Sequence, residues 1–390
     1  MVDIPAVQAG GVGFALTEEQ KMLQNMARDF TAKEIIPHVE EHDEHAKFPM
    51  EIFRKAFEVG LTNMNIPEAY GGIGATVFEE CLVAEEIGYG CTGIGTSVTT
   101  NHLGALPIIL AANEEQKQYW LGERLMDNQQ LVSYGVTEAN AGSNVVGIQT
   151  RAEKKGAKWV INGSKTFITN ASHSDFYTVF AKTDPSAGHR GMTCFVVERD
   201  MPGVSIGKKF DKIGQRASDT AELVFENVEV PEEYMIGEEG RGFYLAMKVF
   251  DHSRPGVAAS AVGLQRRALE ESVKYAKERE AFGVPIFQHQ AIGHKIADMA
   301  INYEAARLLV WQAAWQVDSG IANPKVPAYA KAFAADMATK AAVDAVQVFG
   351  GYGYMKEYPV EKLLRDVKIF QIYEGTSEIQ RNIVVRELFR

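Results

Sequence analysis

The spacing of apolar residues changes twice along this chain, and no other feature restricts the possible folds as strongly. From Thr17 to about Leu131, apolar residues recur with the period of a helix, and after Val132 they form short strand-like runs. After Gly242 the helical period returns and persists to the end. Because strands and helices do not alternate regularly, the pattern excludes a Rossmann domain. We expect an α+β multi-domain protein with an all-α N-terminal domain, a middle β-barrel or sandwich, and a C-terminal four-helix bundle.

The domain boundaries follow from the same changes of period. A chain of 390 residues is long enough for two or three domains, because a single domain usually holds about 100 to 200 residues. The predicted domains cover residues 1–131, 132–236 and 237–390.

Local signals support helices in the first and third domains. Thr17 and Gln20 have the spacing of a capping box at a helix start. Leu23, Met26 and Phe30 then fall on one face of that helix. The other predicted helical stretches are residues 78–89, 113–125, 257–282 and 290–319, and glycine-rich turns such as residues 70–74 separate the early ones.

The middle domain is predicted from several short runs with strand character. Such runs at this spacing indicate a small barrel or sandwich of about 100 residues. Within the first run, Asn162 and Gly163 form a pair that favours a tight hairpin turn, so we expect two strands joined there. Pro231 is expected to close the domain. The runs cover residues 159–168, 176–182, 192–198, 204–208 and 221–230.

Charge and cysteine content exclude several classes of protein. With 40 Lys and Arg against 51 Asp and Glu, the net charge is −11, which does not favour binding to nucleic acid or anionic lipid. Cys81, Cys91 and Cys194 lack metal-ligand spacing, so we expect buried thiols in a reducing compartment and no metal site. No apolar run approaches the ~20 residues of a membrane span. Residues 1–13 lack the pattern of a signal peptide or presequence, so we expect a bacterial cytoplasmic protein, or a mitochondrial matrix protein whose leader has been removed.

The segment before the last predicted helix contains the strongest candidate for a catalytic group. Glu374 lies between an aromatic residue and Gly375, just before a helix start capped by Thr376 or Ser377. Gly375 allows a substrate to approach the backbone, and the free N–H groups of a helix start can donate to a polarised carbonyl. Spacing alone leaves open an exposed carboxylate that only favours the helix dipole.

A glycine cluster could be mistaken for a nucleotide-binding loop. Gly350, Gly351 and Gly353 follow a predicted helix and not a strand, and the later glycine of the dinucleotide fingerprint is missing. The cluster therefore indicates a helix end, and a nicotinamide-dependent dehydrogenase is the weaker interpretation.

Seven motifs, in the same order and over essentially the whole chain, resemble those of the acyl-CoA dehydrogenase family, most closely its medium-chain members. The motifs are VTEANAGSN (136–144), INGSKTFITNA (161–171), GQRASDT (214–220), FDHSRPGVAA (250–259), ERxxFGxPIxxxQ (278–290), QVFGGYGY (347–354) and YEGTSEIQR (373–381). The resemblance implies an α domain, a β barrel and an α bundle, with FAD between barrel and bundle. It also implies a homotetramer in which a neighbour completes each FAD site, and an electron-transfer flavoprotein that accepts the electrons. We predict that surface residues around Ile73 receive this partner.

The resemblance also assigns residues to the cofactor. Residues that would lie at the flavin ring are Val136, Thr137, Phe167, Ile168 and Thr169. Residues that would contact the dinucleotide part of a neighbouring subunit's cofactor are Arg279, Phe282, Gln290, Gln347, Gly350 and Gly351. Thr376 and Glu378 would contact the cofactor beside the catalytic loop. Without the resemblance, Arg279 would be interpreted as a solvated helix charge and Phe282 as a core aromatic.

For substrate and chemistry, the resemblance makes Glu374 the base that removes the Cα proton of a fatty acyl-CoA. The thioester oxygen would be held by the Glu374 N–H and a ribityl hydroxyl, the β-hydrogen would leave as hydride to the flavin, and trans-2-enoyl-CoA would form. Desolvation should raise the pKa of Glu374 toward the working pH. Residues expected to hold coenzyme A or shape its approach are Ser143, Asp251, Ser253, Arg254, Gly375 and Arg386.

Some positions depart from the family pattern and bear on substrate choice. Ala139, Asn140 and Asn144 alter the loop around Ser143, and Phe167 replaces a more usual tryptophan. Some relatives carry the base near residue 253, but Ser253 cannot act as a carboxylate base. Residues 93–100 contain no cation, which disfavours a glutaryl substrate. Gly95 and Thr99 suggest a deeper or wider cavity, for chains somewhat longer or bulkier than octanoyl.

Two other functions stay open. One is a branched-chain, alicyclic or other pathway-specific acyl-CoA dehydrogenase on the same scaffold. The other is a non-catalytic partner that binds flavin and acyl-CoA, which the presence of both Glu374 and Arg254 disfavours.

Overall fold

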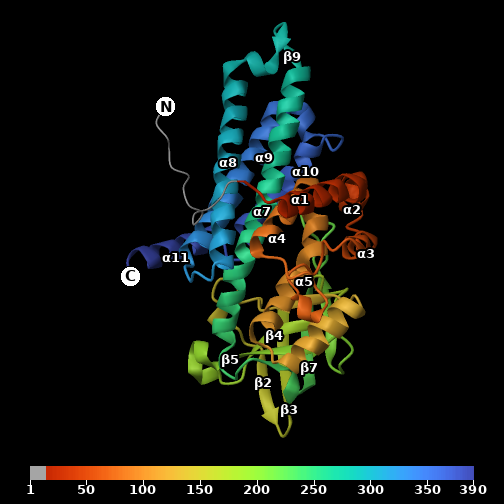
Figure 1. The fold of residues 1–390 in the computed structure, drawn as a ribbon, viewed down its shortest axis with the longest axis vertical. Helices are drawn as coiled ribbons and strands as arrows, with labels where there is room; N and C mark the ends of the chain where they lie inside the picture. The colour runs from red at the N-terminus through yellow and green to blue at the C-terminus, as the bar shows by residue number, and fades with distance from the viewer. Residues whose placement is uncertain (1–14) are drawn as a thin grey trace.

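The computed structural model describes residues 15–390. Figure 1 shows an elongated molecule, with long helices at one end and the β region at the other. The prediction made for residues 1–13 lies outside the described residues. None of the helices within residues 15–390 is long and apolar enough to cross a membrane, and the three cysteines are buried free thiols, as predicted.

The N-terminal region is helical. Thr17 caps the first helix in the predicted box, because its hydroxyl accepts from Gln20 N at 3.2 Å and the Gln20 side chain accepts from Thr17 N at 3.1 Å. Of the residues predicted to share one face of this helix, Phe30 is buried whereas Met26 is 38% exposed. The helices are α1 (Glu18–Phe30), α2 (Val39–Glu44), α3 (Met50–Glu58), α4 (Val77–Gly90), α5 (Thr92–Ala111) and α6 (Glu114–Lys117), which a π-helical segment (Gln118–Asp127) extends.

The middle region is one eight-stranded sheet with the order β6-β7-β3-β2-β4-β5-β8, in which β1 pairs with β4. Its strands are β1 (Val132–Gly135), β2 (Arg151–Lys155), β3 (Lys158–Thr169), β4 (Phe176–Lys182), β5 (Met192–Glu198), β6 (Val204–Lys209), β7 (Thr220–Pro231) and β8 (Met235–Ile236). Pro231 ends β7 as expected, and β8 then adds one more short strand beside β5.

The predicted hairpin turn at Asn162 and Gly163 is wrong. Both residues lie inside the single strand β3, at a point where its register with β7 shifts. The Asn162 side chain accepts from Asn227 N at 2.8 Å, and a Cβ on Gly163 would lie 2.6 Å from the Thr150 hydroxyl. The pair therefore makes a bulge in which glycine permits close backbone approach. The chain turns instead near Gly156, whose φ is 65°.

The C-terminal region consists of long helices and their connections. The predicted stretch 257–282 is part of α7 (Gly242–Glu278), which begins earlier, includes Pro255, and ends before the short hairpin of β9 (Glu280–Ala281) and β10 (Val284–Pro285). The other helices are α8 (Gln290–Asp318), α9 (Lys325–Phe349), α10 (Pro359–Val367) and α11 (Ser377–Leu388).

Helix α7 joins the two ends of the molecule (Figure 1). Its first turns bury Leu245 and Val249 in the core that includes the sheet residue Phe180. Farther along, Ala258 and Leu264 pack in an all-helical core with α8 and α9. Because one rigid helix belongs to both cores, the side chains at its middle are fixed where the helical and β regions meet.

Candidate active site

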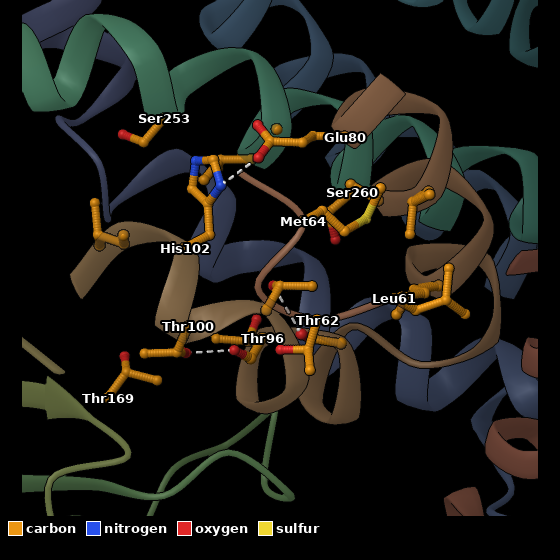
Figure 2. A pocket seen from close by; sticks show the side chains of 18 of the residues that line it. Leu61, Thr62, Met64, Glu80, Thr96, Thr100, His102, Thr169, Ser253 and Ser260 are labelled. Carbon is orange, nitrogen blue, oxygen red and sulfur yellow. Dashed lines mark hydrogen bonds and ion pairs between the residues drawn. The ribbon is translucent and has the colours of Figure 1, made fainter. Parts of the chain in front are cut away.

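A cavity of about 160 Å³ lies where α4, α5, α7 and the loop before α11 meet (Figure 2). Ser253 reaches it from α7, Thr99 and His102 from α5, Glu80 from α4, and Glu374 from the loop. Gly95 and Thr99, for which a deeper or wider cavity is predicted, lie in its wall. Segments that are distant in sequence thus form one enclosed site.

The loop that carries Glu374 is held in an uncommon conformation. Glu374 has φ 55° and Gly375 has φ 84°, both in the left-handed region. The Gln380 amide donates to the Glu374 carbonyl at 3.1 Å and to the Gly375 carbonyl at 3.0 Å, and Lys331 Nζ also donates to the Gly375 carbonyl at 2.6 Å. Ser253 Oγ donates to Glu374 Oε2 at 2.8 Å. These contacts fix both the backbone and the carboxylate.

The electrostatic surroundings of Glu374 suit a proton acceptor. Desolvation raises the pKa of this carboxyl, while the Ser253 hydrogen bond and the charges of Arg254 and Lys331 act in the opposite direction. The net shift is upward, which is the direction expected from the sequence. A carboxylate with a raised pKa is a stronger base toward a weakly acidic C–H group.

Backbone donors lie beside this carboxylate. In the described part of the chain, the N–H of Glu374 donates to no protein acceptor. Thr376 caps α11, as predicted, by accepting from Ile379 N at 3.2 Å, and Glu378 lies exposed in the first helical turn. The free N–H can therefore donate to a carbonyl oxygen bound next to Glu374.

The residues predicted at the flavin ring are brought together next to the cavity. Val136 and Thr137 follow β1, and Thr166 N donates to the Thr137 carbonyl at 2.9 Å, which joins this segment to the end of β3. Phe167 has φ 59° and is 61% exposed, whereas Ile168 is buried. Thr169 lines the same cavity as Glu374. The exposed ring of Phe167 can pack against the edge of a bound planar ring.

The residues predicted for the dinucleotide lie far from Glu374 within one chain. Arg279, Gly350 and Gly351 line a second cavity of about 640 Å³. Phe282 is on the β9–β10 hairpin, at the opposite end of the molecule from the β region (Figure 1), and is 97% exposed, so the core-aromatic interpretation is wrong. No atom lies within 4 Å of a Cβ built on either glycine. This open surface, with the guanidinium of Arg279 on it, has room for part of an extended anionic cofactor. Gln290 begins α8, and Gln347 lies in the last turn of α9.

The residues predicted for coenzyme A converge only in part. Arg254 is 5% exposed and pairs with Asp251, so it is a buried ion-pair residue. Its Nε is buried without a partner within residues 15–390. Arg386 is exposed and contacts Glu387, but its charge acts on both Asp251 and Arg254, which places it nearby. Ser143 is exposed in the loop after β1.

Three residues of the site carry no signal in the sequence. Glu80 and His102 face each other in the cavity, with 2.7 Å between Oε1 and Nδ1 (Figure 2). Lys331 is buried on α9 and reaches the catalytic loop. They come from three helices, and no motif or short spacing connects them, so only the packing of the helices brings them together.

Three family models match the chain. They are the N-terminal domain of acyl-CoA dehydrogenase over residues 17–126, its middle domain over residues 133–228, and its C-terminal domain over residues 240–389. The matches follow one another in the order of the three structural regions.

Individual proteins are similar over nearly the full length. An acyl-CoA dehydrogenase of Bacillus subtilis is 45% identical, with 96% of this chain and 98% of that protein aligned. A Caenorhabditis briggsae protein, named probable medium-chain specific acyl-CoA dehydrogenase 2, mitochondrial, is 44% identical over 98% and 93% of the two chains. The structure of butyryl-CoA dehydrogenase from Megasphaera elsdenii is 41% identical, with a TM-score of 0.94 over 97% of this chain and 100% of that one.

Proposed function

We propose that this chain, which belongs to the acyl-CoA dehydrogenase family of flavin-linked oxidoreductases, oxidises a saturated acyl-CoA. The product would be trans-2-enoyl-CoA, and the reaction would be a step of fatty acid β-oxidation. The observation that carries this proposal is the Glu374 carboxylate in the cavity wall. Its pKa is raised by desolvation, Ser253 orients it at 2.8 Å, and a free backbone N–H lies beside it.

The chain's own groups account for proton removal. The Cα–H of a thioester is a very weak acid, so a carboxylate can remove it only if the charge that develops on the thioester oxygen is stabilised. The free N–H of Glu374 donates to that oxygen, and the Glu374 carboxylate takes the proton from Cα. Lys331 and Gln380 hold the loop carbonyls, so neither group has to reorganise during the step.

FAD, when bound, accepts the two electrons that leave the substrate. The segments after β1 and at the end of β3 would hold its ring, through Val136, Thr137, Phe167, Ile168 and Thr169, with Thr376 and Glu378 at the catalytic loop. The distance of the Arg279 surface from Glu374 in one chain supports a homotetramer. In that assembly Arg279, Phe282, Gln290, Gln347, Gly350 and Gly351 would hold the dinucleotide of a neighbour's cofactor.

Arg254 suits the coenzyme A end of the substrate, because its guanidinium stays charged and keeps an unused donor in Nε. With Gly375, it would hold the thioester end, while Asp251, Ser253, Ser143 and Arg386 shape the approach. Gly95 and Thr99 support acyl chains somewhat longer or bulkier than octanoyl, and a branched-chain or alicyclic substrate is the second candidate. A kcat/KM series that peaks at butanoyl would exclude the longer chains, because each buried CH₂ contributes ~0.8 kcal/mol.

Electrons would pass to an electron-transfer flavoprotein. Ile73 is 51% exposed and lies within the turn at residues 70–74, so we place this partner there. Unchanged reduction of the flavoprotein by Ile73→Asp would contradict that position.

Anaerobic titration with acyl-CoAs of graded length and branching tests the proposal, with loss of flavin absorbance as the readout. We expect the wild type to bleach, and Glu374→Gln to bind the same acyl-CoA without bleaching. If both proteins bleach, Glu374 is not the base. If neither bleaches while both bind, the chain is a binding protein.

A further inference from the structure

The wall of the cavity contains a charged pair where a saturated chain needs only apolar contacts. The side chains of Glu80 and His102 are 11% and 22% exposed, and their 2.7 Å contact faces the cavity (Figure 2). Burial opposes the charged ring, but the Glu80 carboxylate outweighs this effect, and the pKa of His102 is raised. The pair therefore favours the imidazolium form, in which the second nitrogen, Nε2, also carries a proton.

The hydroxyls of Thr62 and Thr99 donate to backbone carbonyls, whereas His102 Nε2 and the Ser260 hydroxyl are left without partners among the residues that the structure describes. The hydroxyl of Thr62 donates to the Val98 carbonyl at 2.8 Å, and that of Thr99 to the Gly95 carbonyl at 2.9 Å. Within residues 15–390, His102 Nε2 has no hydrogen-bond partner, because the only polar contact of this ring is the one to Glu80. The Ser260 hydroxyl, in the same wall, also has none among these residues.

A plain alkyl chain is a poor match for this wall. It would remove water from Nε2–H and from the Ser260 hydroxyl without supplying an acceptor, and a buried donor left unsatisfied is costly. A carboxylate at the same place is also disfavoured. Of the charged residues that line the cavity, Glu80 and Glu374 are carboxylates and only His102 is basic, so a third anion beside the pair would be repelled.

We propose that His102, oriented by Glu80, is a specificity-determining residue for acyl-CoAs that carry an uncharged oxygen, as a hydroxyl or keto group, beyond the two reacting carbons. The inference rests on the proposed function, since it assigns the substrate class of the same cavity. Nε2–H donates to the substrate oxygen, and Ser260 offers a second polar contact.

The test compares kcat/KM for octanoyl-CoA, its 5-hydroxy and 5-oxo derivatives, and suberyl-CoA, which carries a terminal carboxylate. For the FAD-loaded wild type we expect an oxygen-bearing derivative to be preferred over octanoyl-CoA by roughly tenfold to a hundredfold, the effect of a hydrogen bond from a charged donor. His102→Leu should bring that ratio close to one.

Because His102→Leu leaves the Glu80 carboxylate buried and unpaired, the double variant Glu80→Gln/His102→Leu is measured beside it. Equilibrium binding of the same acyl-CoAs to both proteins gives a readout that does not require turnover. His45→Leu is the matched control, because it makes the same substitution at an exposed histidine outside the cavity lining and should leave the ratio unchanged.

The outcomes separate this inference from the proposed function. If the wild type oxidises octanoyl-CoA and the derivatives equally well, and the double variant has the same ratio, the inference is overturned while the proposed function stands. Preference for suberyl-CoA would overturn the assignment of an uncharged group. If no acyl-CoA reduces the flavin of the wild-type protein, the proposed function fails, and the inference fails with it.

Discussion

At the scale of the residue, Lys331 is the least expected group near the base. Its side chain is 1% exposed, its ammonium donates to the Gly375 carbonyl, and burial lowers its pKa to about 8. Its positive charge counters the desolvation that raises the pKa of Glu374. Lys331 is therefore a positioning residue that also favours the deprotonated form of Glu374, the proposed base.

Replacement of this charge should move the pH profile of the reaction. Flavin reduction needs the Glu374 carboxylate, so its rate rises as pH increases through the pKa of Glu374. In Lys331→Met that pKa rises further, and the midpoint of the rate profile should shift to higher pH. Stopped-flow reduction at a series of pH values measures it. Lys356→Met, at an exposed position, should keep the wild-type midpoint, and a uniform loss of rate without a shift in Lys331→Met would contradict the charge effect.

At the scale of the element, β3 shows how one glycine sets the shape of a strand beside the site. The register shift at Gly163 lets β3 pass close to Thr150 and continue to Thr169, which lines the cavity. A straight strand without this bulge would change the direction of its far end and so the position of Phe167.

Gly163→Ala should destabilise the protein by about 2 kcal/mol or more, because the added methyl overlaps backbone and side-chain atoms of Thr150 in a tightly packed region. Urea unfolding of the FAD-loaded protein measures the change. The control is Gly156→Asn in the β2–β3 turn, where the glycine also has positive φ but a Cβ meets nothing within 4 Å. Asparagine tolerates that conformation, so equal losses in both variants would contradict the steric argument.

At the scale of the whole molecule, the residues proposed for the cofactor form two separate groups within one chain. The group proposed for the flavin ring lies beside the cavity of Glu374, which Thr169 lines, whereas Phe282 stands nearly fully exposed beyond the end of α7. An aromatic side chain in that state makes little contribution to the stability of its own chain. Its exposure is explained if a second copy and that copy's cofactor cover it.

Phe282→Ala should therefore lower the FAD content of the purified protein severalfold without loss of helix content. Flavin absorbance per chain and circular dichroism measure the two quantities. Met22→Ala, which removes another exposed side chain from α1 (70% exposed), should retain full FAD. A normal FAD content in Phe282→Ala would argue against the neighbouring-subunit site.

The sequence by itself determined the order of a helical, a β and a second helical region, because helix and strand periods are local properties of the chain. It also placed Glu374 just before the start of α11, since a glycine and a capping threonine act within a few residues. It misplaced the turn at Asn162 and Gly163, where pairing with β7 overrides the local preference for a hairpin. Only the tertiary structure brought Glu80, His102 and Lys331 to the site. Their positions depend on how separate helices pack, and the desolvation that shifts their pKa values exists only after that packing has excluded water.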